Sequence, residues 1–352
     1  MSRQNPHHRA FFSIKTAAML LALGMGSAAA NAAPVTFSHK DWDLSCDNTL
    51  TCRAAGYAND GEEQGSTVLL TRKAGSGESV ANKVMLDNYS DAEWREAPPP
   101  ELIVAGRTAG PLSFSGDESW QMNEAQLSRF LTALKKDEAI SFRQNGSTYL
   151  FSGAGSSAVL LKMDDVQGRV NTAGAILRKG KGSESSVKAP IAAPVITRAP
   201  VKDKELRPMT AQEDALIRPV LLQVLAADAE QSCSDDRLSE PWGIARLNQQ
   251  FSLVGAPCWL AAYNGGSAYF VINNNVQSAP LLVSTSATDY DNGTISSSMK
   301  GRGLGDCWSY EASVWDGTGF VESERGDTGR CALIRAGGAW DIPEYVSQVV
   351  GP

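Results

Sequence analysis

Residues 41–52 read DWDLSCDNTLTC, and this stretch carries the clearest fold signal in the chain. Trp42, Leu44 and Cys46 alternate with polar residues, and a period of two is typical of a strand with one buried face. The turn that follows leads to Cys52, and residues 53–57 continue as a second strand. The sequence therefore predicts two strands joined by a short turn that a Cys46–Cys52 disulfide can close.

Short apolar runs separated by turn residues continue this pattern. Further strands are predicted over residues 68–72, 80–86, 102–105, 140–142, 149–151 and 173–177. Asn123 and Gln126 form a capping box, and the apolar residues after them recur at helical spacing up to Leu134. A shorter helix is predicted over residues 157–166.

A second patterned region begins with another capped helix. Thr210 and Glu213 form its capping box, and apolar residues follow at helical spacing up to Leu225. Turn signals then divide the rest of the chain at residues 264–266, 292–293, 316–317 and 337–338. We predict an antiparallel meander or barrel with one packed helix here, and an α+β fold with predominantly antiparallel β structure for the whole chain.

The composition changes between these two regions. Residues 179–205 are mainly Lys, Gly, Ser, Ala and Pro, which bury too little apolar surface to offset the entropy of ordering. We interpret them as an extended, mobile linker between an N-terminal β-rich domain, 33–178, and a C-terminal helix-plus-meander domain, 206–352. Each domain would be stabilised by disulfides and carry one or two packed helices.

Residues 1–32 have the three parts of a cleavable secretory signal. Arg3, Arg9 and Lys15 form a basic start, residues 17–25 are apolar, and small residues follow. The apolar run is too short to span a bilayer, which needs roughly 20 residues. Cleavage is expected before Ala33, or alternatively after residues 28–30, and no membrane span is predicted.

Removal of the signal changes the charge of the chain. It leaves 29 of the 32 basic residues (32 − 3) and all 39 acidic ones, a net charge of −10. This balance argues against a nucleic-acid partner or an anionic membrane, because both bind through Lys and Arg.

All six cysteines lie after the signal. An even number in an oxidising compartment predicts disulfides, and the linker favours sequential pairing among the possible arrangements. The expected pairs are Cys46–Cys52, Cys233–Cys258 and Cys307–Cys331. No C-x-x-C pair indicates redox activity, and no finger-like spacing indicates zinc, so we predict no metal or other cofactor.

Three segments resemble a bacterial family. Residues 42–46, the stretch 158–169 and the segment from Gly305 through Trp315 to Cys331 look like the family known as domain of unknown function 1176. That resemblance implies an exported six-cysteine protein of the Gram-negative periplasm, and it implies no activity. The first domain is also distantly similar to invasion-associated locus B proteins.

Few residues point to catalysis. His39 is the only histidine after the signal, and it lies close to the expected mature N-terminus, where segments are often loose. The chain has no H-E-x-x-H, G-x-S-x-G or Walker motif. The glycines of residues 301–305 favour a turn over a phosphate cradle. We therefore assign no catalytic residue.

One candidate group contains Asp164, Asp165 and Arg169. Adjacent carboxylates can bind a cation or raise one another's pKa. Neighbouring positions on a helix diverge by about 100°, so the two carboxylates would struggle to reach one site. A structural reading is favoured, with Asp165 and Arg169 as an ion pair four residues apart.

Two further groups of residues have both a functional and a structural interpretation. Residues 289–293, DYDNG, resemble half of a calcium loop, but Gly293 and Lys300 occupy positions where ligands are needed, so a hairpin is favoured. Four aromatics could form a platform for a sugar or peptide, although core packing is commoner. They are Trp308, Tyr310, Trp315 and Phe320.

These patterns lead to two functional hypotheses. The first is a non-enzymatic envelope protein that binds an unknown protein or a cell-wall component. The second is a histidine-independent hydrolase that cleaves cell-wall polysaccharide with two carboxylates about 5 to 9 Å apart. Solvent-exposed aromatics would favour the first, and a cleft with two partly buried acids would favour the second.

Overall fold

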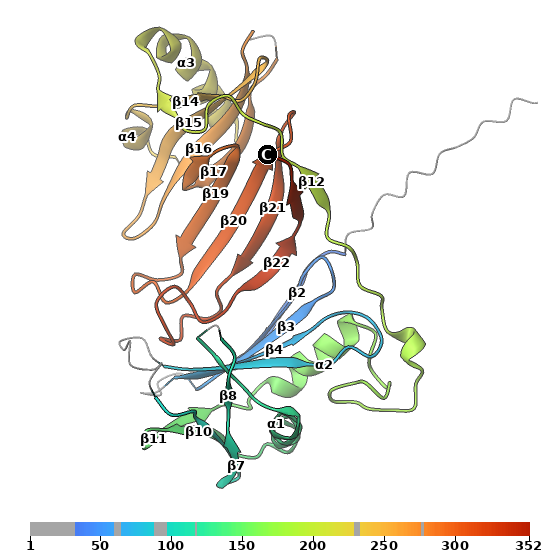
Figure 1. Ribbon diagram of the computed structural model, residues 1–352. Helices are drawn as coiled ribbons and strands as arrows, with labels where there is room; N and C mark the ends of the chain where they lie inside the picture. The colour runs from blue at the N-terminus through green and yellow to red at the C-terminus, as the bar shows by residue number, and fades with distance from the viewer. Residues whose placement is uncertain (1–31, 60–64, 88–96, 117, 229–232, 276–277) are drawn as a thin grey trace, which may run out of the picture. The chain divides into compact units, whose positions relative to one another are not determined.

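The computed structural model describes residues 32–59, 65–87, 97–116, 118–228, 233–275 and 278–352 (Figure 1). Antiparallel strands predominate and helices are few, so the predicted fold class is confirmed. The predicted export signal, apart from Ala32, lies outside the described residues. Among the residues that are described, no helix is both long and apolar enough to cross a membrane.

Two antiparallel sheets form the first region. The seven-stranded sheet has the order β1-β2-β3-β4-β5-β9-β8, and the four-stranded sheet has the order β11-β10-β6-β7. The strands are β1 (Val35–His39), β2 (Trp42–Cys46), β3 (Cys52–Tyr57), β4 (Ser66–Arg72), β5 (Ala81–Leu86), β6 (Glu101–Val104), β7 (Arg107–Pro111), β8 (Ser113–Phe114), β9 (Trp120–Gln121), β10 (Ile140–Gln144) and β11 (Ser147–Phe151). Residues 41–52 therefore form the predicted hairpin.

Two helices pack against these sheets. Helix α1 (Glu124–Lys136) begins at the Asn123 capping box, as predicted, and α2 (Ser156–Val166) follows β11. The core between them contains Trp42, whose ring meets that of Phe151 edge-on at 5.8 Å between centroids. Gly56 allows this packing, because a Cβ there would lie 2.4 Å from the Trp42 ring.

The strand predicted over residues 173–177 is wrong. This segment consists of turns, and its only ladder contact among the described residues is an isolated bridge between Thr172 and Gly182. The N–H groups of Ile176 and Leu177 donate to one oxygen of Asp164. A side-chain carboxylate thus takes the hydrogen bonds that a neighbouring strand would otherwise accept.

The second region contains two five-stranded antiparallel sheets and two helices. The sheets run β13 to β17 and β18 to β22 in chain order. The strands are β13 (Arg207–Pro208), β14 (Gly243–Arg246), β15 (Phe251–Leu260), β16 (Gly265–Asn273), β17 (Leu281–Ala287), β18 (Asp289–Asp291), β19 (Thr294–Lys300), β20 (Trp308–Trp315), β21 (Phe320–Asp327) and β22 (Ile342–Val346). The antiparallel order of the predicted meander is confirmed.

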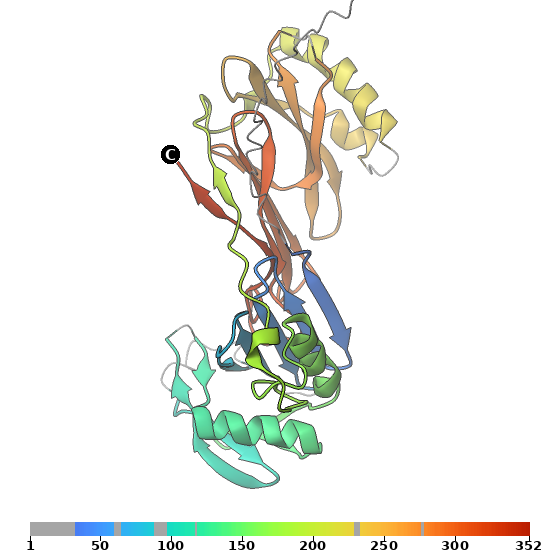
Figure 2. The same ribbon diagram turned by 90° about the vertical axis from the view of Figure 1, so that its right-hand side faces the viewer.

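Helix α3 (Ala211–Ala227) begins at the predicted Thr210 capping box, and the short helix α4 (Asp235–Leu238) follows it. In Figure 2, α3 lies in yellow along the sheet that contains β15 and β16. Leu221 and Leu225 anchor it against Trp242 and Phe270 of that layer.

The segment 179–205 makes backbone hydrogen bonds along its length. Strand β12 (Val195–Thr197) pairs in parallel with β23 (Gln348–Val350), and a short 3-10 helix spans Glu184–Ser186. The N–H of Ala199 donates to the carbonyl of Trp315, and the N–H of Lys202 donates to that of Leu247. The division of the chain into two domains around this segment stays a prediction.

The three disulfides join the predicted pairs. Cys46 bonds to Cys52, Cys233 to Cys258, and Cys307 to Cys331. A disulfide stabilises the folded protein because it lowers the entropy of the unfolded chain. In this chain-entropy model the two longer loops each add roughly 3.5 kcal/mol to the free energy of unfolding, and the short loop adds roughly 2 kcal/mol.

Residues near the C-terminus pack on the first sheet. Ile334, Trp340 and Ile342 form a buried cluster with residues of β3, β4 and β5 that include Tyr57 and Met85. The indole N–H of Trp340 donates to the hydroxyl of Thr67 at 2.9 Å, and both residues are buried. This contact between distant parts of the chain positions the site described next.

Candidate binding cavity

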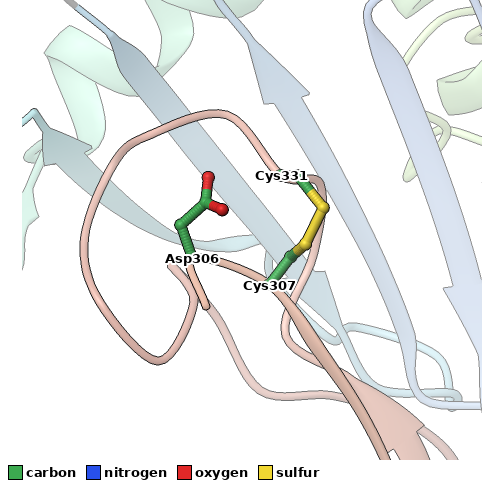
Figure 3. A group of neighbouring side chains, drawn as sticks. All are labelled: Asp306, Cys307 and Cys331. Carbon is green, nitrogen blue, oxygen red and sulfur yellow. A yellow bond between two sulfur atoms is a disulfide. The ribbon is translucent and has the colours of Figure 1, made fainter. Parts of the chain in front are cut away.

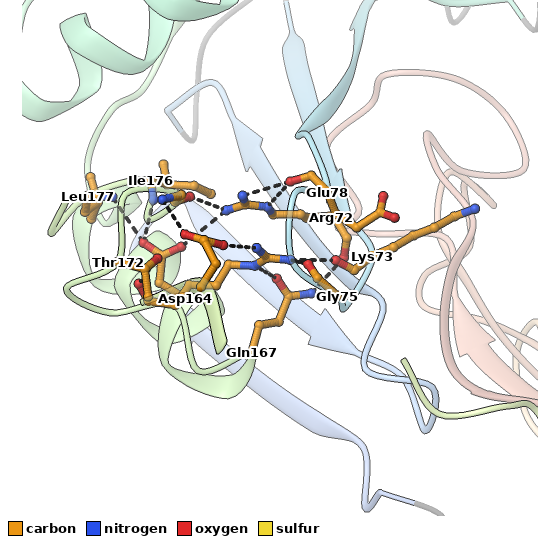
Figure 4. A network of polar contacts seen from close by, with 12 residues as sticks. Arg72, Lys73, Gly75, Glu78, Asp164, Gln167, Thr172, Ile176 and Leu177 are labelled. Carbon is orange, nitrogen blue, oxygen red and sulfur yellow. Dashed lines mark hydrogen bonds and ion pairs between the residues drawn. The ribbon is translucent and has the colours of Figure 1, made fainter. Parts of the chain in front are cut away.

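Asp164 lies at the centre of a buried polar network (Figure 4). Its carboxylate is fully buried; one oxygen accepts the two N–H donors of Ile176 and Leu177, and the other lies 3.7 Å from Arg72 Nη1. Burial raises the pKa of this carboxyl group, and the two N–H donors and the Arg72 charge oppose the rise. The network orders the turn after α2.

Arg169 belongs to the same network. Its side chain is fully buried; Nε donates to Gln167, and Nη2 donates to the carbonyls of Lys73 and Gly75. Its Nη1 lies 3.9 Å from a carboxylate oxygen of Glu184. Burial lowers the pKa of Arg169. These contacts fix the residues after β4 to the end of α2.

Asp165 does not join this network, and its expected ion pair with Arg169 is wrong. Asp165 is exposed and pairs with Lys162 at 3.0 Å. Because α2 ends at Val166, Arg169 is no longer on the helix and turns into the interior. Asp164 and Asp165 face different surroundings, so they do not form a shared cation or acid–base site.

The four aromatic candidates do not all lie at the surface. Trp315 is fully buried and packs against Phe320 and Phe251, so it belongs to a core. Trp308 donates to the carbonyl of Gly305 and lies under the Lys300 ammonium, 5.3 Å from its nitrogen. Tyr310 donates to Asp341 at 2.5 Å. Trp315 therefore offers no exposed ring to a sugar, and a platform formed by the other three aromatics stays a prediction.

Two metal-like patterns have structural explanations. Figure 3 shows Asp306 beside Cys307 and Cys331, whose sulfurs are joined in a disulfide and are not available as thiolate ligands. Asp306 itself accepts hydrogen bonds from Arg302 and from the N–H of Leu333, and the Arg302 contact lowers its pKa.

The half calcium loop at residues 289–293 is the predicted hairpin. Strands β18 and β19 pair on either side of Asn292 and Gly293, whose φ values are 44° and 80°. Two consecutive positive φ values are those of a type I′ turn, which suits the Asn-Gly sequence.

A polar cavity of about 450 Å³ lies where the C-terminal residues meet the first sheet. One wall comes from β1, β2 and Arg53 of β3, and the other comes from β21, β22 and the chain between them. The polar lining consists of Thr36, Ser38, Asp43, Ser45, Arg53, Asp327, Arg330 and Glu344. The cavity thus combines hydroxyl, carboxylate and guanidinium groups.

Arg330 and Asp43 span the cavity wall. Nε and Nη2 of Arg330 donate to the two Asp43 oxygens at 2.5 and 2.8 Å, a bidentate pair. The Arg330 guanidinium lies 5.5 Å from the ring centre of Tyr57, and the backbone N–H of Arg330 donates to the Tyr57 hydroxyl at 3.1 Å. The hydrogen bonds to Asp43 raise the pKa of Arg330, so this guanidinium stays charged.

Asp327 and Glu344 also line the cavity, and their hydrogen bond and ion pair join them to residues of their own wall and not to the first sheet. Asp327 accepts the N–H of Gly329 at 2.7 Å, and Glu344 lies 3.3 Å from Arg325 Nε. Burial is the largest cause of a raised pKa for Asp327, and the negative charges of Glu344, Asp43 and Asp341 add to it. Asp327 therefore binds a proton more readily than an exposed aspartate does.

The same two carboxylates also line a second cavity of about 310 Å³. Tyr310, Ser297 and Arg325 lie on its walls. Burial and the hydrogen bond to Asp341 raise the pKa of Tyr310, so this phenol stays protonated and keeps the O–H that it donates to Asp341. Asp327 and Glu344 thus face both cavities.

Backbone contacts hold the two walls together. The side-chain amide of Asn48 donates to the carbonyl of Val346 at 3.0 Å and accepts its N–H at 2.8 Å. The Ser45 hydroxyl donates to the carbonyl of Pro343 at 3.2 Å. Gly329 adopts a φ of +85°, and a Cβ there would lie 2.4 Å from the Tyr57 hydroxyl, so only glycine fits.

Sequence reasoning did not single out Asp327, Arg330 or Glu344. A local signal was present, because Asp327 and Arg330 closely precede Cys331, whose disulfide fixes their position. Asp43, on the facing wall, lies 287 residues before Arg330, and no local pattern connects the two.

A protein-family model matches most of the chain. The model described as "Protein of unknown function (DUF1176)" matches residues 36–347. The chain belongs to this family. The resemblance drawn from residues 42–46, 158–169 and 305–331 is thereby confirmed, and the DUF1176 match includes both walls of the cavity.

The chain is also similar to "Uncharacterized protein YpfG" of Escherichia coli (strain K12). The two are 25% identical over 316 residues, which cover 82% of this DUF1176 chain and 86% of the relative. No solved structure matches the chain.

Proposed function

We propose that the protein is an exported, non-enzymatic binding protein of the bacterial envelope, and that its ligand occupies the cavity between Asp43 and Glu344. The cavity itself carries this proposal, because it offers hydroxyl, carboxylate and guanidinium groups within about 450 Å³, a volume in the range of small-ligand sites. Export rests on the predicted signal and fits the three disulfides.

The polar character of the walls indicates the ligand. Asp327 and Glu344 accept hydrogen bonds, and Thr36 and Ser38 both donate and accept them. A cell-wall fragment with sugar hydroxyls and amide or amino groups matches this set. The likeness of the first domain to invasion-associated locus B proteins stays a prediction and names no ligand.

A thermal-shift series tests the binding proposal. Soluble peptidoglycan fragments should raise the melting temperature of the oxidised protein, because a ligand that binds only the native state stabilises it. The Asp327→Asn variant should lose this rise, whereas Asp289→Asn, on the exposed β18 outside the cavity, should keep it. The absence of any shift with the unaltered protein would count against the proposal.

One observation favours a second candidate, a histidine-independent glycan hydrolase. Asp327 has a raised pKa beside Glu344, and glycosidases pair a protonated acid with an ionised carboxylate. Binding is favoured over hydrolysis because Asp43 and Glu344 are already held in ion pairs with Arg330 and Arg325. These are the two carboxylates that would otherwise serve as nucleophile or base. Release of new reducing ends from peptidoglycan, abolished by Asp327→Asn, would establish hydrolysis instead.

A further inference from the structure

One row of side chains crosses five neighbouring strands of the first sheet, from β1 to β5. Its members pair in turn, in the order Thr36, Ser45, Arg53, Thr71 and Ala81. Side chains that pair directly lie on the same face of an antiparallel sheet. Because neighbouring strands are about 4.8 Å apart, the row is about 19 Å long.

This row lines two adjoining cavities. Its first three members line the cavity of about 450 Å³, here called the first cavity, and its last three line a third cavity of about 650 Å³. Arg53 belongs to both cavities. Ile342 lines the first cavity and Trp340, two residues earlier, lines the third, and both pack with Ala55 of the same sheet. The two cavities are therefore neighbouring parts of one sheet face.

The two cavities differ in their balance of charge. The first cavity is lined by two guanidinium groups and three carboxylates, which leaves an excess of one negative charge. The third cavity is lined by the cationic side chains of Arg53, Lys83 and Arg335 and by one carboxylate, that of Asp341, which leaves an excess of two positive charges. The third cavity therefore favours an anionic group that the first cavity would repel.

The two arginines of the third cavity are held by partners that leave donors for a ligand. Arg53 donates through Nη1 to Asp47 at 2.8 Å. Arg335 donates through Nε to the carbonyl of Gly338 at 2.9 Å and through Nη1 to Glu118 at 3.0 Å. A guanidinium has five N–H donors, so these bonds among the described residues use one on Arg53 and two on Arg335. The two side chains are 19% and 33% exposed, so their other donors can meet a ligand.

Apolar and amide groups complete the third cavity. Leu69, Met85 and Trp340 are buried side chains that give it apolar surface. Gln121 is exposed on β9, and its amide can both donate and accept hydrogen bonds. A peptide with carboxylate groups matches all three kinds of wall, because it has amide bonds, apolar carbon and negative charge. A simple inorganic anion would leave the apolar surface uncovered.

We propose that the third cavity binds an acidic peptide attached to the glycan in the first cavity, so that one cell-wall fragment extends past Arg53. This inference rests on the proposed function and adds a second part to the ligand. The charges set its orientation: sugar hydroxyls and amino groups face Asp327 and Glu344, and peptide carboxylates face Lys83 and Arg335.

Calorimetric titration of the oxidised protein with two probes tests this inference. One probe is a peptidoglycan disaccharide that carries its tetrapeptide, and the other is the same disaccharide without peptide. The unaltered protein should bind the peptide-bearing probe about tenfold more tightly. The Lys83→Gln, Arg335→Gln double variant should lose this advantage and bind the peptide-free probe as the unaltered protein does.

A matched control removes the same two residue types elsewhere. The Arg143→Gln, Lys162→Gln double variant loses one arginine and one lysine from exposed ion pairs outside both cavities. It should keep the full advantage of the peptide-bearing probe. Circular dichroism and the melting temperature should show that both double variants fold.

Substitution of Gln121 tests the charge argument without removing a charged side chain. Gln121→Glu should weaken binding of the peptide-bearing probe several-fold, and Gln121→Lys should strengthen it, because the two changes add opposite charges to the cavity. Neither change should alter binding of the peptide-free probe. Shifts in the same direction for both variants would contradict the inference.

The two probes separate this inference from the proposed function. If both probes bind equally well, the inference is overturned and the binding proposal stands. An advantage that the Lys83→Gln, Arg335→Gln variant retains would also overturn the inference, and so would its loss in equimolar inorganic phosphate, which would assign the cations to a simple anion. Failure of both probes to bind the unaltered protein would overturn both proposals.

Discussion

Arg330 donates two hydrogen bonds to Asp43, although the two residues are 287 positions apart in the sequence. The pair lies on the wall of the cavity and joins the first antiparallel sheet to the residues that follow β21. The cavity therefore exists only when both ends of the chain are folded together.

Replacement of Asp43 by Asn should weaken this junction. A bidentate charge-assisted pair that is partly buried contributes about 1 to 2 kcal/mol, so the free energy of unfolding in urea should fall by that amount. The Arg143–Glu101 pair is the matched control, since it is also close, at 2.5 Å, but more exposed. Glu101→Gln should cost less than Asp43→Asn, and equal costs would contradict the assigned role.

Substitution of the neighbouring residues Asp164 and Asp165 should have very different effects on stability. Asp164→Ala removes a buried carboxylate from Arg72 and from two backbone donors, and should cost about 3 kcal/mol or more. Asp165→Ala removes an exposed ion pair and should change stability by less than about 1 kcal/mol. Urea unfolding measures both, and similar values would show that the network is not structural.

The raised pKa of Asp327 links stability to pH. The folded state holds this proton more tightly than the unfolded state, so its contribution to stability falls as the pH rises from 3.8 through the raised pKa. Asp327→Asn stays neutral throughout. The variant should match the unaltered protein at low pH and be the more stable one near neutral pH. A stability difference that does not depend on pH would contradict this assignment.

The Cys307–Cys331 disulfide should support the cavity as well as the fold. Replacing both cysteines with Ser removes a loop constraint worth roughly 3.5 kcal/mol. Arg330 adjoins Cys331, so amide hydrogen exchange should also increase at residues 328–346. The Cys233–Cys258 pair closes a loop of nearly the same length, and its double replacement should lower stability without exposing those residues.

Local signals predicted much of the fold. The alternation at Trp42, Leu44 and Cys46, and the capping boxes at Asn123 and Thr210, depend on residues within one turn or strand of each other. The disulfide pairs were also predictable, because each joins cysteines no more than 25 residues apart.

The errors and omissions come from longer-range contacts. The strand expected near Ile176 was replaced by turns because Asp164 takes its N–H donors. Arg169 does not pair with Asp165 as expected, because the helix ends three residues before Arg169 and the guanidinium binds backbone carbonyls in the interior. The cavity was missed because Asp43 and Arg330 meet only in the folded chain.

Calorimetric titration with soluble peptidoglycan fragments tests the central claim, that the cavity is a binding site, most directly. The unaltered protein should bind with measurable heat, the Asp327→Asn, Glu344→Gln double variant should bind at least tenfold more weakly, and Asp289→Asn should bind as the unaltered protein does. Equal binding by all three proteins, or no binding by the unaltered one, would contradict the account.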